Sequence, residues 1–171
     1  MMKVTTLCAA LSLSAVAVWA VDRADTNFMH KAAQGGLAEV KMGQLAADKG
    51  SNQAVKDFGQ QMVTDHSKAN DDLKNVASGK GVTLPDSLDA KDQALYDKLS
   101  KLSGSAFDRA YINAMVRDHE TDVSEFRKEA SAASDPDLKS FVGKTLPTLE
   151  HHLEMAKKAQ RELGTRSAKT R

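Results

Sequence analysis

Cysteine and aromatic residues are scarce in this sequence of 171 residues. A single cysteine, Cys8, excludes an intramolecular disulfide. Aromatic residues make up 5% of the chain, which argues against a sheet, because strands are enriched in aromatic and β-branched side chains. Prolines are few, and Ala, Leu, Lys, Asp, Gln and Met are abundant. This composition predicts an all-α fold.

The chain also lacks an excess of either charge. Lys and Arg total 24 against 23 Asp and Glu, so the formal net charge is +1. Proteins that bind nucleic acid usually show a clear excess of positive charge. The sequence contains neither a Gly-rich phosphate loop nor a serine nucleophile motif. We therefore expect no nucleic-acid partner and find no support for a hydrolase or a nucleotide-dependent enzyme.

The only long apolar run lies at the N-terminus. Lys3 precedes apolar residues 4–18, and Val18-Trp19-Ala20 fits a signal-peptide cleavage site. The run is shorter than the roughly 20 residues of a membrane span. We therefore interpret residues 1–20 as a signal peptide and expect a periplasmic or otherwise exported protein with no membrane span in the mature chain. Cleavage would remove Cys8, so core packing alone would stabilise the mature domain.

Four long segments carry apolar residues at alternating spacings of three and four, which is typical of amphipathic helices. These segments are residues 24–49, 52–78, 105–133 and 136–163. Ser105 and Asp108 resemble a capping box at the start of the third segment. The pattern therefore predicts four long helices that bury one apolar seam each.

The connection between the second and third helices decides the topology. Residues 80–104 are too long for a hairpin loop, and residues 89–102 within them predict a short helix. A connection of this length returns the chain to the opposite end of the bundle. It therefore favours an antiparallel, ferritin-like four-helix bundle that spans residues 21–163. An up-down-up-down bundle is the alternative. Residues 164–171 are expected to form a basic, flexible tail.

One ionisable residue interrupts each apolar seam. The four residues are Glu39, His66, His119 and His152. With a rise of about 1.5 Å per residue, they fall within one or two helical turns of each other in a ferritin-like bundle. A buried Glu with three His is a ligand set that suits zinc, copper or iron. Flanking residues that could orient the imidazoles or join the site are Asp65, Asp118, Glu150 and His151.

The same layer also has a metal-free interpretation. A lone histidine on a seam is more often a hydrogen-bonded core residue than a metal ligand. A protonated histidine would pair with Glu39, whose charge is costly to bury alone. The sequence therefore leaves three possibilities open: a metal centre, a structural polar network, and a register in which the four residues do not meet.

Methionines accompany these four residues at helical spacing. Met42, Met62, Met115 and Met155 each lie three or four positions from one of them. Stacked thioethers and imidazoles would favour copper(I) or silver. Methionine is also an ordinary filler of irregular cores, so the spacing alone does not decide between these roles.

Four short motifs occur in order along the chain. They are Gly35-Gly36-x-Ala38-Glu39, Met62-Val63-x-Asp65-His66, Met115-Val116-x-Asp118-His119 and Leu146-Pro147-x-Leu149-x-x-His152. Together they resemble the bacterial domain of unknown function 4142 family over about residues 25–160. The resemblance implies an exported, ferritin-like four-helix protein, often labelled an outer membrane protein. It implies no established activity.

Proteins of the wider ferritin-like group often hold two iron atoms with Glu-x-x-His motifs. No histidine of this chain has a glutamate three residues before it, so we do not expect a di-iron oxidase or an iron-storage ferritin. Three classes remain. We favour an exported protein that buffers a transition metal. The alternatives are a metal-free structural or envelope-stress protein with an unknown protein partner, and a redox enzyme; the sequence leaves enzymatic activity undecided and favours its absence.

Overall fold

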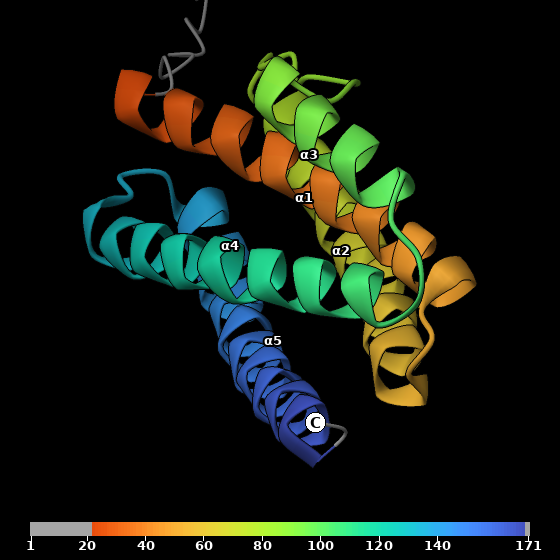
Figure 1. Cartoon of the computed structure of the whole chain (residues 1–171). Helices are drawn as coiled ribbons and strands as arrows, with labels where there is room; N and C mark the ends of the chain where they lie inside the picture. Colours follow the sequence, from red (N-terminus) through yellow and green to blue (C-terminus); the bar gives the residue numbers. More distant parts are fainter. Residues whose placement is uncertain (1–21, 170–171) are drawn as a thin grey trace, which may run out of the picture.

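All regular structure in residues 22–169, which the computed structural model describes, is helical (Figure 1). The helices are α1 (Arg23–Lys49), α2 (Gln53–Ser78), α3 (Ala90–Ser100), α4 (Gly104–Ala132) and α5 (Pro136–Lys169). The predicted all-α fold is therefore confirmed. Within the described residues, none of the helices is long and apolar enough to cross a membrane. The signal peptide predicted at residues 1–20 lies outside the described residues.

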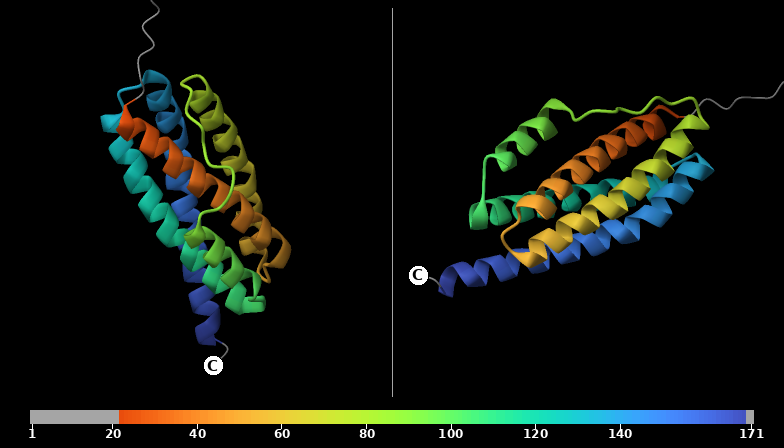
Figure 2. Two further views of the ribbon diagram at one scale, coloured as in Figure 1. Left: turned by 90° about the horizontal axis from the view of Figure 1, so that it is seen from above. Right: turned by 90° about the vertical axis from the view of Figure 1, so that its right-hand side faces the viewer.

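The helices pack together as a bundle. The most extensive contacts join α1 to α2 and α4 to α5 (Figures 1 and 2). Helix α2 also packs on α5, and α1 packs on α4. The short helix α3 lies against α1 and α4. Figure 2 shows the segment between α2 and α3 running alongside α1, where the Gln34 side-chain amide donates a hydrogen bond of 2.9 Å to the Ser87 carbonyl.

The last helix extends further than the sequence predicts. We expected α5 to end at Leu163, before Gly164, but it continues to Lys169. A glycine in a helix costs only about 1 kcal/mol relative to alanine. The surrounding sequence offers no proline and no other strong helix breaker, so one glycine does not end the helix.

Two clusters of buried apolar side chains form the core. The first contains Phe58, Phe107 and Tyr111, and the rings of Phe107 and Tyr111 stack with centroids 5.9 Å apart. The second contains Phe28 and Phe126, which meet edge to face at 4.9 Å. The two clusters supply most of the apolar burial that stabilises the bundle.

Two buried aspartates hold the chain where it enters a helix. Asp108 of α4 accepts hydrogen bonds from the backbone N–H groups of Ser51 and Asn52, at 2.9 and 3.0 Å, just before α2. Asp25 of α1 accepts from the Ser134 hydroxyl and the Asp135 N–H, at 3.0 and 3.1 Å, just before α5. Each carboxylate therefore ties one helix to the start of another, and satisfies N–H groups that no helical carbonyl can reach.

The capping box predicted at Ser105 and Asp108 is therefore wrong. Helix α4 begins at Gly104, one residue earlier, after Ser103, whose side chain makes no capping hydrogen bond. Gly104 has a φ of 57°, a conformation that glycine adopts readily. The Asp108 carboxylate is used instead by the turn before α2.

Two glycines allow α1 and α2 to approach closely. A Cβ atom on Gly43 would lie 2.8 Å from the Gly59 carbonyl oxygen, and one on Gly59 would lie 2.6 Å from the Gly43 carbonyl oxygen. Both distances are too short for non-bonded atoms. The backbones can meet at this crossing only because both residues lack a side chain.

We predict that Gly59→Ala destabilises the protein by about 1–3 kcal/mol, because the added methyl group forces the two backbones apart. Gly143→Ala in α5 is the matched control, since a Cβ atom there has no neighbour within 4 Å. The control should stabilise the helix by up to about 1 kcal/mol. Urea unfolding of both variants measures the difference, and equal stability of the two would contradict the close approach.

Candidate metal centre

Three histidines from three helices meet in the core. They are His66 of α2, His119 of α4 and His152 of α5, and at most 6% of any of them is exposed. Their ring centroids lie 5.3, 5.5 and 5.7 Å apart, which makes a nearly regular triangle. One nitrogen from each ring lies within 4.8 Å of the other two. The structure thus brings together three of the four residues that the sequence singled out.

The layer lies between the two apolar clusters. The Phe58 ring of the first cluster is 6.5 Å from the rings of both His119 and His152. On the other side, His66 and Phe126 of the second cluster line a small cavity of about 30 Å³. A cavity of this size holds about one water molecule or one ion.

Hydrogen bonds fix the orientation of two of the rings. His152 Nε2 lies 2.8 Å from Asp65 Oδ2, and His119 Nδ1 lies 3.0 Å from the Met115 carbonyl oxygen. Both partners are acceptors, so the proton of each neutral ring resides on the nitrogen that faces them. A ring N–H held by a carboxylate or a carbonyl is the usual arrangement behind a metal-bound histidine.

The opposite nitrogens have no partner. His66 Nε2, His119 Nε2 and His152 Nδ1 are all buried, and none has a hydrogen-bond partner among the described residues. The tautomers of His119 and His152 leave a lone pair on these atoms. Each ring therefore buries one nitrogen that no hydrogen-bond donor of the described residues satisfies.

Burial also keeps the rings uncharged. Desolvation lowers the pKa of His66 well below its usual value, and it lowers the pKa of His119 to about 4, with the neighbouring His152 adding to the effect. Burial lowers the pKa of His152 as well, although its hydrogen bond to Asp65 acts in the opposite direction. Neutral imidazole is the form that binds metal ions.

Glu39 is completely buried but occupies a different position. Its Oε1 atom lies 3.6 Å from His119 Nδ1, the nitrogen that already faces the Met115 carbonyl, and not from the unpartnered Nε2. The Glu39 carboxylate instead groups with those of Asp118 and Asp122. Its membership of a metal site stays a prediction. Glu39 lies on the Nδ1 side of the His119 ring.

An ion pair between Glu39 and His119 is the metal-free alternative that the sequence suggested. The distance of 3.6 Å permits it, but the protonation of both partners opposes it. Burial and the nearby Asp118 raise the pKa of Glu39 well above its usual value, whereas burial lowers that of His119. Desolvation opposes the ion pair, because two buried groups become charged only if their mutual attraction exceeds the cost of removing both charges from water. Burial therefore favours the neutral form of both groups.

The predicted flanking residues behave differently from one another. Asp65 binds His152, as described above. Glu150 is instead paired with Arg127 at 2.7 Å on the surface, and His151 is exposed. The methionines lie in the first apolar cluster, with Met42, Met62 and Met115 fully buried and Met155 packed against them. Nothing in the sequence indicated that the backbone carbonyl of Met115 would orient His119.

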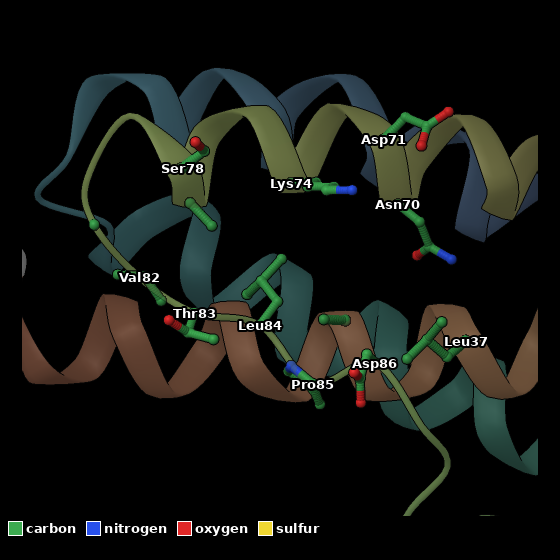
Figure 3. A pocket seen from close by; sticks show the side chains of 13 residues that line it. Leu37, Asn70, Asp71, Lys74, Ser78, Val82, Thr83, Leu84, Pro85 and Asp86 are labelled. Carbon is green, nitrogen blue, oxygen red and sulfur yellow. The ribbon is translucent and has the colours of Figure 1, made fainter.

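A larger cavity lies elsewhere. A groove of about 640 Å³ runs between α1, α2 and the segment that follows α2, and contains no histidine. Figure 3 shows Leu37 of α1, Asn70 and Lys74 of α2, and Leu84 of the connecting segment around it. The candidate metal centre is thus an enclosed layer and not an open pocket.

By its fold and its site, the protein is an all-helical bundle with a buried layer of three histidines. The chain belongs to the family described as domain of unknown function (DUF4142), whose model matches residues 10–159. This confirms the resemblance that the motifs predicted. None of the curated proteins compared with the sequence matches it.

Solved structures share the fold. A DUF305 fragment from Deinococcus radiodurans has a TM-score of 0.74 at 11% identity and covers 83% of this chain and 98% of its own. CopM in the Cu(I)-bound form has a TM-score of 0.68, and CopM in the Ag-bound form 0.67. Both match at 15% identity and cover 81% of this chain and 96% of their own. At such identities the likeness shows the fold alone.

We predict that the metal-free protein loses stability as the pH falls from about 6.5 towards 4. The unfolded chain takes up protons on its histidines near pH 6.5, whereas His119 stays neutral down to about pH 4 in the folded state. Protons therefore favour unfolding across this window. At about 1.4 kcal/mol per pKa unit, His119 alone contributes roughly 3 kcal/mol that is present above pH 6.5 and lost below it.

Urea unfolding of the wild type and of His119→Gln at several pH values isolates this contribution. The comparison is needed because the raised pKa of the buried Glu39 acts in the opposite direction. The wild type should lose more stability between pH 6.5 and 4 than the variant does. The same pH slope in both proteins would mean that His119 titrates normally in the folded state.

Proposed function

We propose that the protein binds one transition-metal ion through His66, His119 and His152, and that the preferred ion is copper(I). One observation carries the proposal: three buried imidazole rings lie together with one nitrogen of each within 4.8 Å of the other two, and each ring has a buried nitrogen without a hydrogen-bond partner among the described residues. A buried polar atom without a partner costs about 1–3 kcal/mol. A metal ion that accepts all three lone pairs removes this cost at once.

The spacing of the rings supports a single ion. With a metal–nitrogen distance of about 2 Å and a ring centre about 1 Å beyond the nitrogen, three imidazoles around one ion have centres roughly 5 Å apart. The observed centroid distances are 5.3–5.7 Å. Small side-chain rotations would therefore complete the site.

The charge of the layer favours a monovalent ion. All three ligands are neutral, and the desolvation cost of an ion rises steeply with its charge. Asp65 behind His152 offers a nearby negative charge. Zinc would take a fourth ligand as well, whereas copper(I) accepts imidazole and thioether ligands. The likeness to CopM, whose structures hold copper(I) and silver, adds support.

We further propose that the bundle is antiparallel and ferritin-like, as the long connection between α2 and α4 suggests. Two pairs between α1 and α4 support this arrangement. Lys31 pairs with Glu125 and Glu39 lies beside His119, so residue numbers rise along one helix as they fall along the other. The proposed signal peptide at residues 1–20 would place this bundle in the periplasm, where a buried copper(I) site would serve to buffer or carry the ion.

Titration with silver(I), an air-stable substitute for copper(I), tests the site. The wild type should bind one equivalent and melt at a higher temperature when loaded, because a ligand at 1,000 times its Kd stabilises the folded state by about 4 kcal/mol. His66→Ala, His119→Ala and His152→Ala should each weaken binding at least 100-fold. His30→Ala and His151→Ala are the controls, since both side chains are exposed, and they should bind as the wild type does.

Competition with a chromogenic copper(I) chelator and parallel titrations with zinc and iron(II) identify the ion. Copper(I) binding at one equivalent supports the assignment. If zinc or iron(II) alone binds to the three histidines, the assignment of copper(I) is wrong. If no metal binds at micromolar concentration, the layer is a structural polar network and the protein acts through another surface.

Asp65 should position His152 for metal binding. We predict that Asp65→Ala weakens silver(I) binding about 10- to 100-fold, because the variant loses the hydrogen bond that fixes the ring orientation. Asp57→Ala is the control, since this carboxylate is exposed on the same helix and accepts a hydrogen bond from Gln53 one turn away. Calorimetry of both variants checks the difference, and equal affinities would show that the ring is oriented without Asp65.

A further inference from the structure

A second group of candidate ligands lies behind His119. The carboxylates of Glu39, Asp118 and Asp122 each offer an oxygen within 4.8 Å of the other two. Asp118 and Asp122 lie one turn apart on α4, and both are partly exposed. Glu39 comes from α1 and is completely buried. Two helices therefore bring three acidic side chains to one place, close to the surface on one side and to the core on the other.

Glu39 is the unusual member of this group. Both of its carboxylate oxygens are buried and accept no hydrogen bond from a described residue, and the Asp118 carboxylate is the side chain within hydrogen-bonding reach. His119, its nearest basic neighbour, directs its ring N–H to the Met115 carbonyl at 3.0 Å, closer than the 3.6 Å to Glu39. Glu39 is therefore a buried carboxyl group beside a second carboxyl group, and a cation would offset the cost of burying its charged form.

The surroundings add further negative charge. Asp92 of α3 is buried nearby and raises the pKa of both Glu39 and Asp122. Burial, Asp118 and Glu125 together raise the pKa of Asp122 to about 7, and Lys91 opposes them only partly. Lys31 of α1 is already paired with Glu125 of α4, at 2.9 Å. A cation would relieve the repulsion within this group.

The outer side of the group faces solvent. Gly35 of α1 lies opposite Asp122, and a Cβ atom on it would be 4.0 Å from Asp122 Oδ2, so only a small residue stands on that side. The partial exposure of Asp118 and Asp122 gives water and ions access to the group from the surface.

We propose that Glu39, Asp118 and Asp122 form a second cation site, separate from the histidine layer, which binds a hard divalent ion such as Mn²⁺, Ca²⁺ or Mg²⁺. These ions prefer carboxylate oxygens and retain water ligands, whereas copper(I) prefers nitrogen and sulfur. Glu39 supplies the buried ligand, and the two aspartates close the site on the outer side. This inference does not depend on the proposed copper(I) site.

Titration with Mn²⁺ tests the second site directly, because the electron paramagnetic resonance signal of free Mn²⁺ decreases when the ion binds to protein. The wild-type chain should take up one equivalent, and Ca²⁺ or Mg²⁺ in excess should displace it. Asp122→Asn should weaken Mn²⁺ binding at least tenfold. Asp57→Asn removes an exposed carboxylate elsewhere and should leave the affinity unchanged.

Two comparisons separate this site from the histidine layer. His66→Ala should bind Mn²⁺ as the wild type does, and wild type loaded with silver(I) should still take up Mn²⁺. Circular dichroism verifies that each variant is folded. The proposal is overturned if the wild type leaves the Mn²⁺ signal unchanged, or if Asp122→Asn binds Mn²⁺ as tightly as the wild type. It is also overturned if the loss of His66 abolishes Mn²⁺ uptake.

Discussion

The unsatisfied polar layer in the core is the constraint around which this bundle is built. His66, His119 and His152 each bury a nitrogen that has no partner among the described residues, and such atoms oppose folding. The apolar clusters on either side must offset this cost. The close crossing of α1 and α2 at Gly43 and Gly59 increases the packing available to do so. A core designed only for stability would place leucines in the layer.

The helices and the level of the histidines could be predicted from the sequence because both depend on regular geometry. A period of 3.6 residues and a fixed rise determine which face of a helix is buried and how far along the bundle a residue lies. These quantities require no knowledge of side-chain contacts. His66, His119 and His152 therefore meet where the seams predicted, on three different helices.

The position of Glu39 could not be predicted in the same way. Its level along α1 is close to that of the histidines, but the orientation of the His119 ring decides which nitrogen it faces. That orientation depends on a hydrogen bond to a backbone carbonyl, which the side-chain pattern does not encode. The same limit applies to Asp108. Its position fits a cap on its own helix, yet its carboxylate accepts a hydrogen bond from Asn52, which lies 56 residues away in the turn before α2.

Two kinds of ligand chemistry lie on opposite edges of one histidine. On the Nε2 side of His119 are neutral nitrogens in an apolar core, and on the Nδ1 side are carboxylates that reach the surface. Soft and hard metal ions differ in their preference for these environments. A single helix, α4, thus presents two different environments to metal ions without a cysteine.

The distribution of the histidines over the helices has a consequence for stability. An ion bound by His66, His119 and His152 would link α2, α4 and α5, and would close two long loops of the chain as disulfides do in other proteins. Helix α1 supplies no ligand to that link, and it is held to the bundle by its packing on α2 and by the hydrogen bonds of Asp25 at the start of α5.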